Sequence, residues 1–172
     1  MSIEIKKPNE INMAVDSLFT TLLPYRIDNK VTDFMPFQIN EQGDWIDVKA
    51  ADTYHLKEGE SALISLGFAM KIPYGYEAWL APRSSTFKKW GVIQTNSIGI
   101  IDNSYSGDND IWMMPVLAMR DTTIEKGDRI AQFRLIGSMG KNAYNPSTTI
   151  ILVEVDSLGT PDRGGFGSTG SK

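Results

Sequence analysis

Short apolar segments separated by turn residues dominate the pattern of hydrophobic and polar positions along this chain. Five segments have this form: residues 61–72, 76–82, 110–120, 128–136 and 148–155. Each is short and bounded by proline, glycine or charged turn residues, which is typical of β-strands. Pro115 lies inside the third segment and indicates a sheet edge or a bulge, because proline donates no ladder hydrogen bond. The pattern predicts an all-β fold, either a barrel or a double-sheet jelly roll.

Helical periodicity is weak throughout the chain. The best case is residues 11–23, where Met13, Leu18 and Leu22 predict at most one short helix. We expect one β-barrel domain over residues 1–158, followed by a flexible arm of residues 159–172. The arm ends in DRGGFGSTGSK, a composition that favours neither helix nor strand.

Composition and charge narrow the classes of function. The 172 residues are 41% hydrophobic and 22% charged, which is ordinary for one globular domain. The net charge of -4 argues against a protein that grips nucleic acid, since phosphate neutralisation needs a basic face. No cysteine is present, and the single histidine, His55, cannot build a zinc site alone. No apolar run approaches a membrane span and no signal-peptide pattern is found, so we expect a cytoplasmic protein without a membrane partner.

Arg83, Ser84 and Ser85 lie together in a turn after the segment 76–82. Arginine presents a planar fork of donors that suits phosphate, and serine hydroxyls and turn amides add neutral donors. Taken alone, the same residues also fit a polar turn with a solvated arginine.

The sequence TNSIGIIDNSYSGD (residues 95–108) predicts a hairpin with an apolar arm. Asp102 directly follows two isoleucines, so we expect its carboxylate to be partly shielded, where it can serve as a general base. Tyr105 is placed to stack on a flat ligand. An Asx-turn aspartate beside a packed tyrosine is the competing interpretation.

Two further segments carry polar residues among apolar ones. Strand alternation sends Trp45 and Asp47 to one face of GDWIDVKAA. In KGDRIAQ it places Asp128 and Gln132 on one face and Arg129 on the other. Together, a shielded carboxylate, an Arg-Ser-Ser turn, a tyrosine and a glycine-rich arm indicate a nucleoside triphosphate pocket. We then expect the arm to be a lid that becomes ordered over bound ligand, with Arg163 and Phe166 as its contacts.

In this order, DVKAA, PRSS, NSIGIIDNSYSG, GDRIAQ and RGGFGSTG resemble the five motifs of the trimeric deoxyuridine triphosphate nucleotidohydrolases (dUTPases). The resemblance extends from about residue 43 to the C-terminus. It implies a jelly-roll-like β fold, a homotrimer with active sites between subunits, and Mg²⁺-dependent hydrolysis of dUTP to dUMP and pyrophosphate. Such an activity limits uracil incorporation into DNA and supplies dUMP for thymidylate synthesis.

The resemblance also implies a role for each candidate residue. Asp102 activates the water that attacks the α-phosphorus, and Tyr105 packs under the deoxyribose. Asn96 and the backbone of residues 98–101, including Gly99 and Ile101, read the uracil edge. The remaining substrate contacts, mostly to phosphate, fall on Arg83, Ser84, Ser85, Gln132, Arg163, Gly167, Ser168 and Thr169, with Phe166 stacked over uracil. Asp47 lies at the phosphate and metal end, with Mg²⁺ held chiefly by the phosphates and reaching Asp47 only through water.

The chain departs from the family pattern in two places. Trp45 and Ile46 precede Asp47 where the family has a glycine and an aromatic residue. The chain also has a long lead-in, and residues 24–42 are expected to be an insertion, either a surface elaboration or a site for an additional protein partner.

Other classes of function stay open at this point. A dCTP deaminase shares the fold but needs a glutamate beside the exocyclic amine, and residues 95–108 contain none. A non-catalytic binding protein or a capsid-like structural protein would not need the site residues that occur together in this sequence. The large side chains of residues 110–119 either fill the barrel or line a trimer axis.

Overall fold

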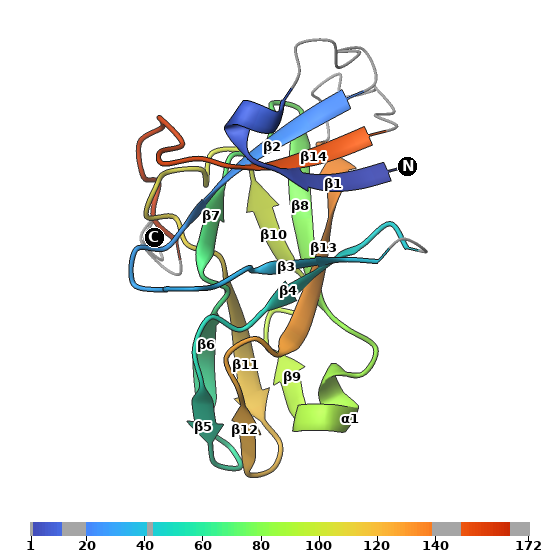
Figure 1. The fold of residues 1–172 in the computed structure, drawn as a ribbon. Helices are drawn as coiled ribbons and strands as arrows, with labels where there is room; N and C mark the ends of the chain where they lie inside the picture. The colour runs from blue at the N-terminus through green and yellow to red at the C-terminus, as the bar shows by residue number, and fades with distance from the viewer. Residues whose placement is uncertain (1, 12–19, 41–42, 139–148, 166–172) are drawn as a thin grey trace, which may run out of the picture.

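The computed structural model describes residues 2–11, 20–40, 43–138 and 149–165, and these form an almost entirely β structure (Figure 1). One sheet has the order β1-β14-β2-β7. Its strands are β1 (Ser2–Lys6), β2 (Thr20–Ile27), β7 (Phe68–Met70) and β14 (Thr149–Glu154). A 3₁₀ turn, Pro8–Glu10, follows β1.

The second sheet carries most of the predicted site and has the order β10-β8-β13-β4-β3. Its strands are β3 (Phe37–Ile39), β4 (Ile46–Lys49), β8 (Tyr76–Pro82), β10 (Gly99–Asp102) and β13 (Arg129–Gly137). All neighbours in this sheet are antiparallel, and β10 is an edge strand.

Two smaller sheets complete the barrel. One has the order β6-β11-β9, and the other pairs β12 with β5. Their bounds are β5 (Tyr54–Leu56), β6 (Ser61–Ser65), β9 (Val92–Gln94), β11 (Met113–Ala118) and β12 (Thr122–Ile124). A five-residue helix, α1 (Thr86–Trp90), precedes β9 and ends at Gly91, whose φ of 63° suits glycine.

Every sheet contributes to the main core cluster, and a small second cluster consists of Ala69, Ile111 and Leu158. The centre of the main cluster is a chain of aromatic contacts in which Tyr25, Phe37, Phe68, Trp112 and Phe133 pack edge-on or tilted, with ring centroids 4.7–6.2 Å apart. These rings come from segments far apart in sequence, so the sheets close on one another around one interior.

The prediction of an all-β fold is confirmed, and the segments 76–82, 128–136 and 148–155 form β8, β13 and β14. The segment 61–72 is two strands in different sheets, because Gly67 turns the chain with a φ of 74°. Pro115 does not mark an edge: β11 lies between β6 and β9, and the ladder to β9 begins one residue later.

The expected hairpin at residues 95–108 is also different, because β10 pairs with β8 and not with β11, the strand that follows it. Of the expected helix at 11–23, residues 12–19 lie outside the described part, and Thr20–Leu23 belong to β2.

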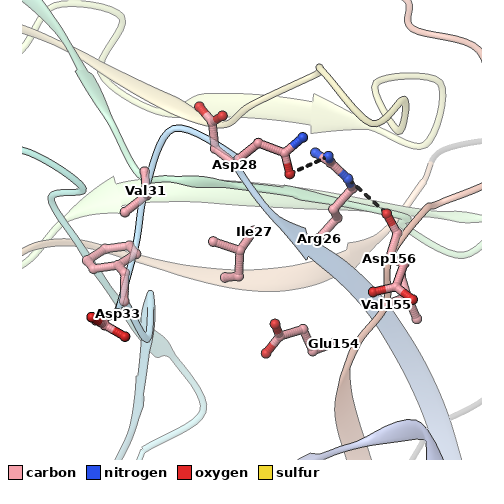
Figure 2. Close-up of a pocket in the computed structure, with 10 residues that line it drawn as sticks. Arg26, Ile27, Asp28, Val31, Asp33, Glu154, Val155 and Asp156 are labelled. Atoms are coloured by element: carbon pink, nitrogen blue, oxygen red, sulfur yellow. Dashed lines mark hydrogen bonds between the residues drawn. The ribbon is translucent and has the colours of Figure 1, made fainter.

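Residues 24–42 are largely part of the barrel. They contain the second half of β2 and all of β3, and they supply the buried rings of Tyr25 and Phe37. Near the end of β2, Arg26 lines a polar pocket with residues of the β14 end (Figure 2). There its Nε donates to the carbonyl of Asp156, at 3.0 Å.

Candidate active site

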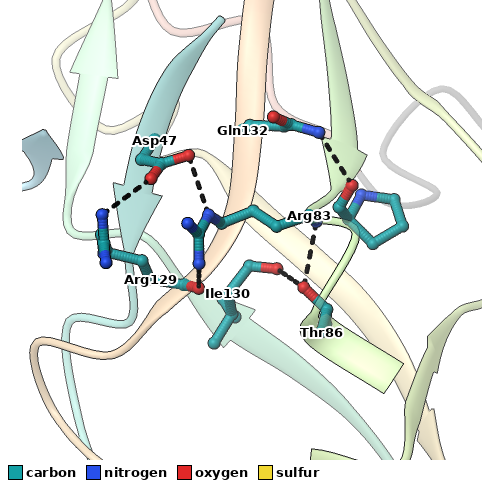
Figure 3. A network of polar contacts seen from close by, with 7 residues as sticks. Asp47, Arg83, Thr86, Arg129, Ile130 and Gln132 are labelled. Atoms are coloured by element: carbon teal, nitrogen blue, oxygen red, sulfur yellow. Dashed lines mark hydrogen bonds and ion pairs between the residues drawn. The ribbon is translucent and has the colours of Figure 1, made fainter. Parts of the chain in front are cut away.

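A buried carboxylate holds two arginines together at one end of the five-stranded sheet (Figure 3). Asp47 on β4 is 7% exposed, and its Oδ1 accepts the Nε of Arg83 at 2.8 Å. Its Oδ2 accepts Nη1 of Arg129 at 3.2 Å. Arg83 Nη1 also donates to the carbonyl of Arg129, at 3.3 Å. A guanidinium on each oxygen fixes both arginines next to one another, which is an arrangement suited to a polyanion.

Arg129 is a site residue that strand alternation placed on the wrong face. The register between β13 and β4 shifts between Arg129 and Ala131, so one extra residue is inserted there. A bulge of this kind turns the side chains before it relative to those after it. As a result Arg129 shares the face of Gln132 and Asp47.

Thr86 fixes the turn that carries Arg83 through two hydrogen bonds. This threonine is fully buried; its hydroxyl accepts the backbone N–H of Arg83 at 3.0 Å and donates to the carbonyl of Ile130 at 2.7 Å. Sequence analysis did not identify Thr86. Ser84 is exposed beside the arginine, and Ser85 precedes α1 and makes no side-chain cap.

Asp47, the two arginines and Ser84 line a pocket of about 670 Å³. Gln132 donates to the carbonyl of Pro82 at 3.2 Å, which leaves its amide oxygen at the pocket. Trp45 lines it too, so the expected common face of Trp45 and Asp47 is confirmed. The lining residues are Gln38, Ile39, Asn40, Gly43, Trp45, Asp47, Arg83, Ser84, Arg129 and Gln132.

Asp102 lies at the end of the edge strand β10 and is half-buried. Its side chain is 44% exposed, and its Oδ2 pairs with Nη1 of Arg163 at 2.9 Å. Oδ1 accepts the backbone N–H of Ser104 at 2.8 Å and the hydroxyl of the same residue. The partial shielding expected for this carboxylate is therefore present in the single chain, and the open side belongs to the edge of the sheet.

Tyr105 packs against the core, and its hydroxyl donates to the carbonyl of Ile111 at 3.0 Å. Burial, followed by the nearby Asp110 carboxylate, raises the pKa of Tyr105 to about 12. The ring is therefore neutral and fixed in place, as a packing surface for a sugar requires.

The predicted uracil-reading residues lie on and before β10. Asn96 is exposed, and its Oδ1 accepts Nε2 of the buried Gln94 at 2.8 Å. Gly99 is buried against Leu80, whereas Ile101 is half-buried. Phe166, Gly167, Ser168 and Thr169 lie outside the described residues.

The two halves of the predicted site do not meet within one chain. Asp102 pairs with Glu77 on β8, and Arg83 follows the other end of the same strand. Arg83 is six positions along the chain from Glu77, and at about 3.3 Å per residue the two positions are about 20 Å apart. The structure thus brings Asp47, Arg83, Arg129 and Gln132 together at one end, and Asp102, Tyr105 and Arg163 at the other.

An arginine pairs with each carboxylate oxygen of Asp47, and its expected contact with Mg²⁺ through water stays a prediction. Among the described residues, no group of three or more acidic or histidine side chains is placed to hold a metal ion. Within the same residues, no helix has the length and apolar character needed to span a bilayer.

Comparison with known proteins gives consistent results. The dUTPase family model matches residues 41–170. The chain is 53% identical over 149 residues to the SPbeta prophage-derived deoxyuridine 5'-triphosphate nucleotidohydrolase YosS of Bacillus subtilis, covering 86% of this chain and 99% of that protein. It is 35% identical over 141 residues to a deoxyuridine 5'-triphosphate nucleotidohydrolase of Hydrogenobaculum, covering 80% and 91%.

Solved structures share the fold. A crystal structure of dUTPase from Streptococcus mutans superposes with a TM-score of 0.61 at 24% identity, covering 67% of this chain and 96% of that one. A mutant dUTPase from phage phi11 of S. aureus, solved with a structural Mg(II) ion, gives a TM-score of 0.58 at 20% identity, covering 71% and 94%.

Proposed function

Because this chain belongs to the dUTPase family, we propose that it hydrolyses dUTP to dUMP and pyrophosphate at sites shared between copies of the chain. The observation that carries the shared site is the separation of about 20 Å between Asp102 and Arg83. A base must lie within hydrogen-bond reach of its water, and that water close to the phosphorus it attacks. Asp102 of one chain therefore works with the arginine pair of another.

An apolar strip on the β6-β11-β9 sheet supports association of the chain. Leu63 and Ile93 are 44% and 42% exposed. Their partners in the ladders are Pro115 and Leu117 on the same outward face. In β11 the side chains alternate, so Met114, Val116 and Ala118 fill the core while Pro115 and Leu117 lie on the opposite face. A closed head-to-tail trimer would bury such a strip and repeat each shared site.

The pocket around Asp47 would take the triphosphate. Arg83 and Arg129 supply charge already oriented by Asp47, and Ser84 and Gln132 border the same space. Because the guanidinium groups are fixed before the ligand arrives, little ordering remains to oppose binding.

Mg²⁺ fits this pocket as a companion of the phosphates and not as a caged ion. It would be held by phosphate oxygens and water, as a hard cation that keeps part of its hydration, and it would neutralise phosphate charge there. Asp47, whose oxygens both face arginines, serves as the counter-ion that positions the pair.

Asp102 would take the proton from the attacking water. In the free chain its partner is Arg163, and the triphosphate offers that guanidinium a more highly charged partner. Transfer of Arg163 to phosphate would end its ion pair with Oδ2 of Asp102, and the attacking water would lie against this carboxylate. The backbone bond from Ser104 to Oδ1 keeps the carboxylate in place meanwhile.

The base and sugar would lie along β10. As an edge strand, β10 turns one side of its backbone away from the sheet, where main-chain donors and acceptors can pair with the uracil edge. Asn96 is held at the start of this strand by Gln94, and Tyr105 packs beside its end.

Pyrophosphate release with Mg²⁺ from dUTP, dCTP, dTTP and UTP, measured side by side, tests the function. We expect turnover of dUTP alone, since the pocket has to exclude a 5-methyl group and a 2′-hydroxyl. Ammonia release from dCTP would indicate a deaminase, and inactivity on all four nucleotides would contradict the proposal. Arg83→Ala should raise KM for dUTP by about tenfold or more, as expected for a lost charge-assisted phosphate contact.

A further inference from the structure

Gln94, the last residue of β9, is a buried polar side chain that packs against the start of β10. It is 8% exposed, and its Nε2 donates twice. One bond goes to the carbonyl of Leu80 on β8, at 3.1 Å, and the other to Oδ1 of Asn96, at 2.8 Å. A Cβ on Gly99, the first residue of β10, would lie 3.7 Å from the same nitrogen. The Gln94 amide thus connects the backbone of β8 to the Asn96 side chain.

The partners of the Gln94 amide determine its orientation. A backbone carbonyl can only accept, so the NH₂ group and not the amide oxygen must face Leu80. With the amide turned over, two carbonyl oxygens would face each other in a buried place. The second hydrogen of the same NH₂ group is the one that reaches Asn96. The backbone of β8 therefore sets the direction of the whole chain of hydrogen bonds.

The orientation of the Asn96 amide follows from that of Gln94. Because Oδ1 of Asn96 accepts the bond from Gln94, its Nδ2 group is the other end of the amide. Asn96 is exposed, whereas Gln94 is buried. The end of Asn96 presented to a ligand beside β10 is therefore a hydrogen-bond donor.

The backbone of Asn96 is held in the same place by a tight turn. The N–H of Ile98 donates to the carbonyl of Asn96 at 2.6 Å, across the single residue Ser97, as in a γ-turn. Ser97 has a φ of 61°, which is uncommon for a residue other than glycine. Its own N–H donates to the carbonyl of Gln94 at 3.3 Å. Gln94 thus contacts this turn through its backbone as well as through its side chain.

The amide oxygen of Gln94 shows that stability alone does not explain a glutamine here. Among the residues that the structure describes, Oε1 of Gln94 is buried without a hydrogen-bond partner. A buried carbonyl in this state costs free energy, and an apolar side chain of similar size would avoid that cost. The bonds that Nε2 makes are therefore the reason for a polar side chain at this position.

The polarity of Asn96 matters because uracil and cytosine differ at C4 of the ring. Uracil carries the acceptor O4 there, whereas cytosine carries an amino group, which is a donor. A fixed donor pairs with the first and faces the hydrogens of the second. A site built in this way can reject the wrong base strongly, because one polar group is left unpaired when that base binds.

We propose that Gln94 determines the preference for uracil over cytosine: as a positioning residue, it holds the Asn96 amide with Nδ2 toward the C4 carbonyl of the base. This rests on the proposed hydrolysis of dUTP with the base along β10. It adds the residue that sets the polarity of base recognition, and it traces that polarity to the carbonyl of Leu80.

Inhibition of dUTP hydrolysis by dUMP and by dCMP tests the proposal, because the two inhibition constants compare the bases directly. Gln94→Met keeps the size of the side chain and removes both donors, so that the Asn96 amide can turn either end to the ligand. We expect the preference for dUMP over dCMP to fall by about tenfold, as for one lost hydrogen bond. Thr95→Ala, next in the chain and exposed, is the control and should leave the preference unchanged. An unchanged preference in Gln94→Met would overturn the proposal.

A second variant reverses the outward end of the side chain directly. Asn96→Asp keeps an acceptor for Gln94 but replaces the outward donor by an acceptor, which can pair with the amino group of cytosine. We expect the preference for dUMP over dCMP to fall by more than in Gln94→Met. A wild-type preference in Asn96→Asp would show that Asn96 does not face C4, and would overturn the proposal as well.

A double substitution separates positioning from a role only in structure. A merely loosened turn would weaken dUMP and dCMP by the same factor and leave their ratio unchanged. In an Asn96→Ala background, Gln94→Met should change the ratio no further, since the residue through which it acts is absent. A further fall there would contradict action through Asn96. A wild-type protein inactive on dUTP would contradict the proposed function, whereas an active one with an unchanged ratio in Gln94→Met would overturn this inference alone.

Discussion

Replacing Asp47 by asparagine distinguishes two possible roles of this residue, as a counter-ion of the arginines and as a contact of the metal ion. The substitution keeps the shape of the side chain and removes its charge. Arg83 and Arg129 would then share no counter-ion, and one carboxylate oxygen would become an amide nitrogen that faces a guanidinium. We expect a loss of stability together with a loss of order in the arginine pair.

The expected loss of stability depends on how deeply the ion pairs of Asp47 are buried. Removing one partner of a fully buried ion pair costs about 3–5 kcal/mol, whereas exposed pairs contribute about 0.2–1 kcal/mol. The Asp47 side chain is 10% exposed, but those of Arg83 and Arg129 are 21% and 39% exposed. An intermediate cost of about 2 kcal/mol lowers Tm by about 4–8 °C for a chain of this length.

Thermal denaturation and a Mg²⁺ titration of dUTP hydrolysis give the two readouts. For Asp47→Asn we expect the lower Tm, a higher KM for dUTP and an unchanged half-saturating Mg²⁺ concentration. The matched control is Asp44→Asn, three residues away and exposed, which should change stability by less than about 0.5 kcal/mol. An unchanged Tm with a several-fold higher Mg²⁺ requirement would refute the counter-ion role and restore the metal contact.

Three further predictions address the other end of the sheet. Asp102→Asn should retain dUTP binding in calorimetry but lower kcat by about 10²–10⁴-fold, and near wild-type turnover would exclude it as the base. Deleting residues 163–172 should leave the melting transition in place, since β14 ends at Glu154, while hydrolysis falls by about 10²-fold; unchanged kinetics would remove any role for the arm. In a spectrophotometric titration Tyr105 should ionise near pH 12 rather than 10.0, and Tyr105→Phe should remove that step. Because folding favours the neutral phenol, its contribution to stability is complete below pH 10 and is lost as pH rises through 12, so a step near pH 10 would contradict its burial.

The strands that could be predicted from the sequence are those whose ends carry their own signals. β8 ends at Pro82, and β13 follows the turn EKG, so local chemistry determines both. The break at Gly67 was not predicted, because a lone glycine inside an apolar run gives no sign that its φ will be positive. The place of residues 24–42 in the core depends on pairing with β7, β14 and β4, which no local pattern records.

The candidate site shows the same division. Motif residues such as Arg83 and Asp102 were identified by their types and order in the chain. Arg129 was assigned to the opposite face because alternation assumes an unbroken ladder. The bulge after Arg129 inserts one residue, so its side chain lies on the same face as that of Gln132. Asp110 and Thr86 escaped notice because their roles are to hold backbone groups of residues distant in sequence.

The position of β14 between β1 and β2 affects how the chain folds during synthesis. Both of its neighbours are parallel to it, and Ser2 at the start of the chain pairs with Thr149 near its end. At about 5–20 residues per second, β1 leaves the ribosome roughly 7–30 s before its partner is made. For that time β1 and the outer edge of β2 present unpaired strands, which are the features that recruit chaperones or promote aggregation. The last strand made is thus the one that closes the sheet, and the arm that follows it can dock only on a finished barrel.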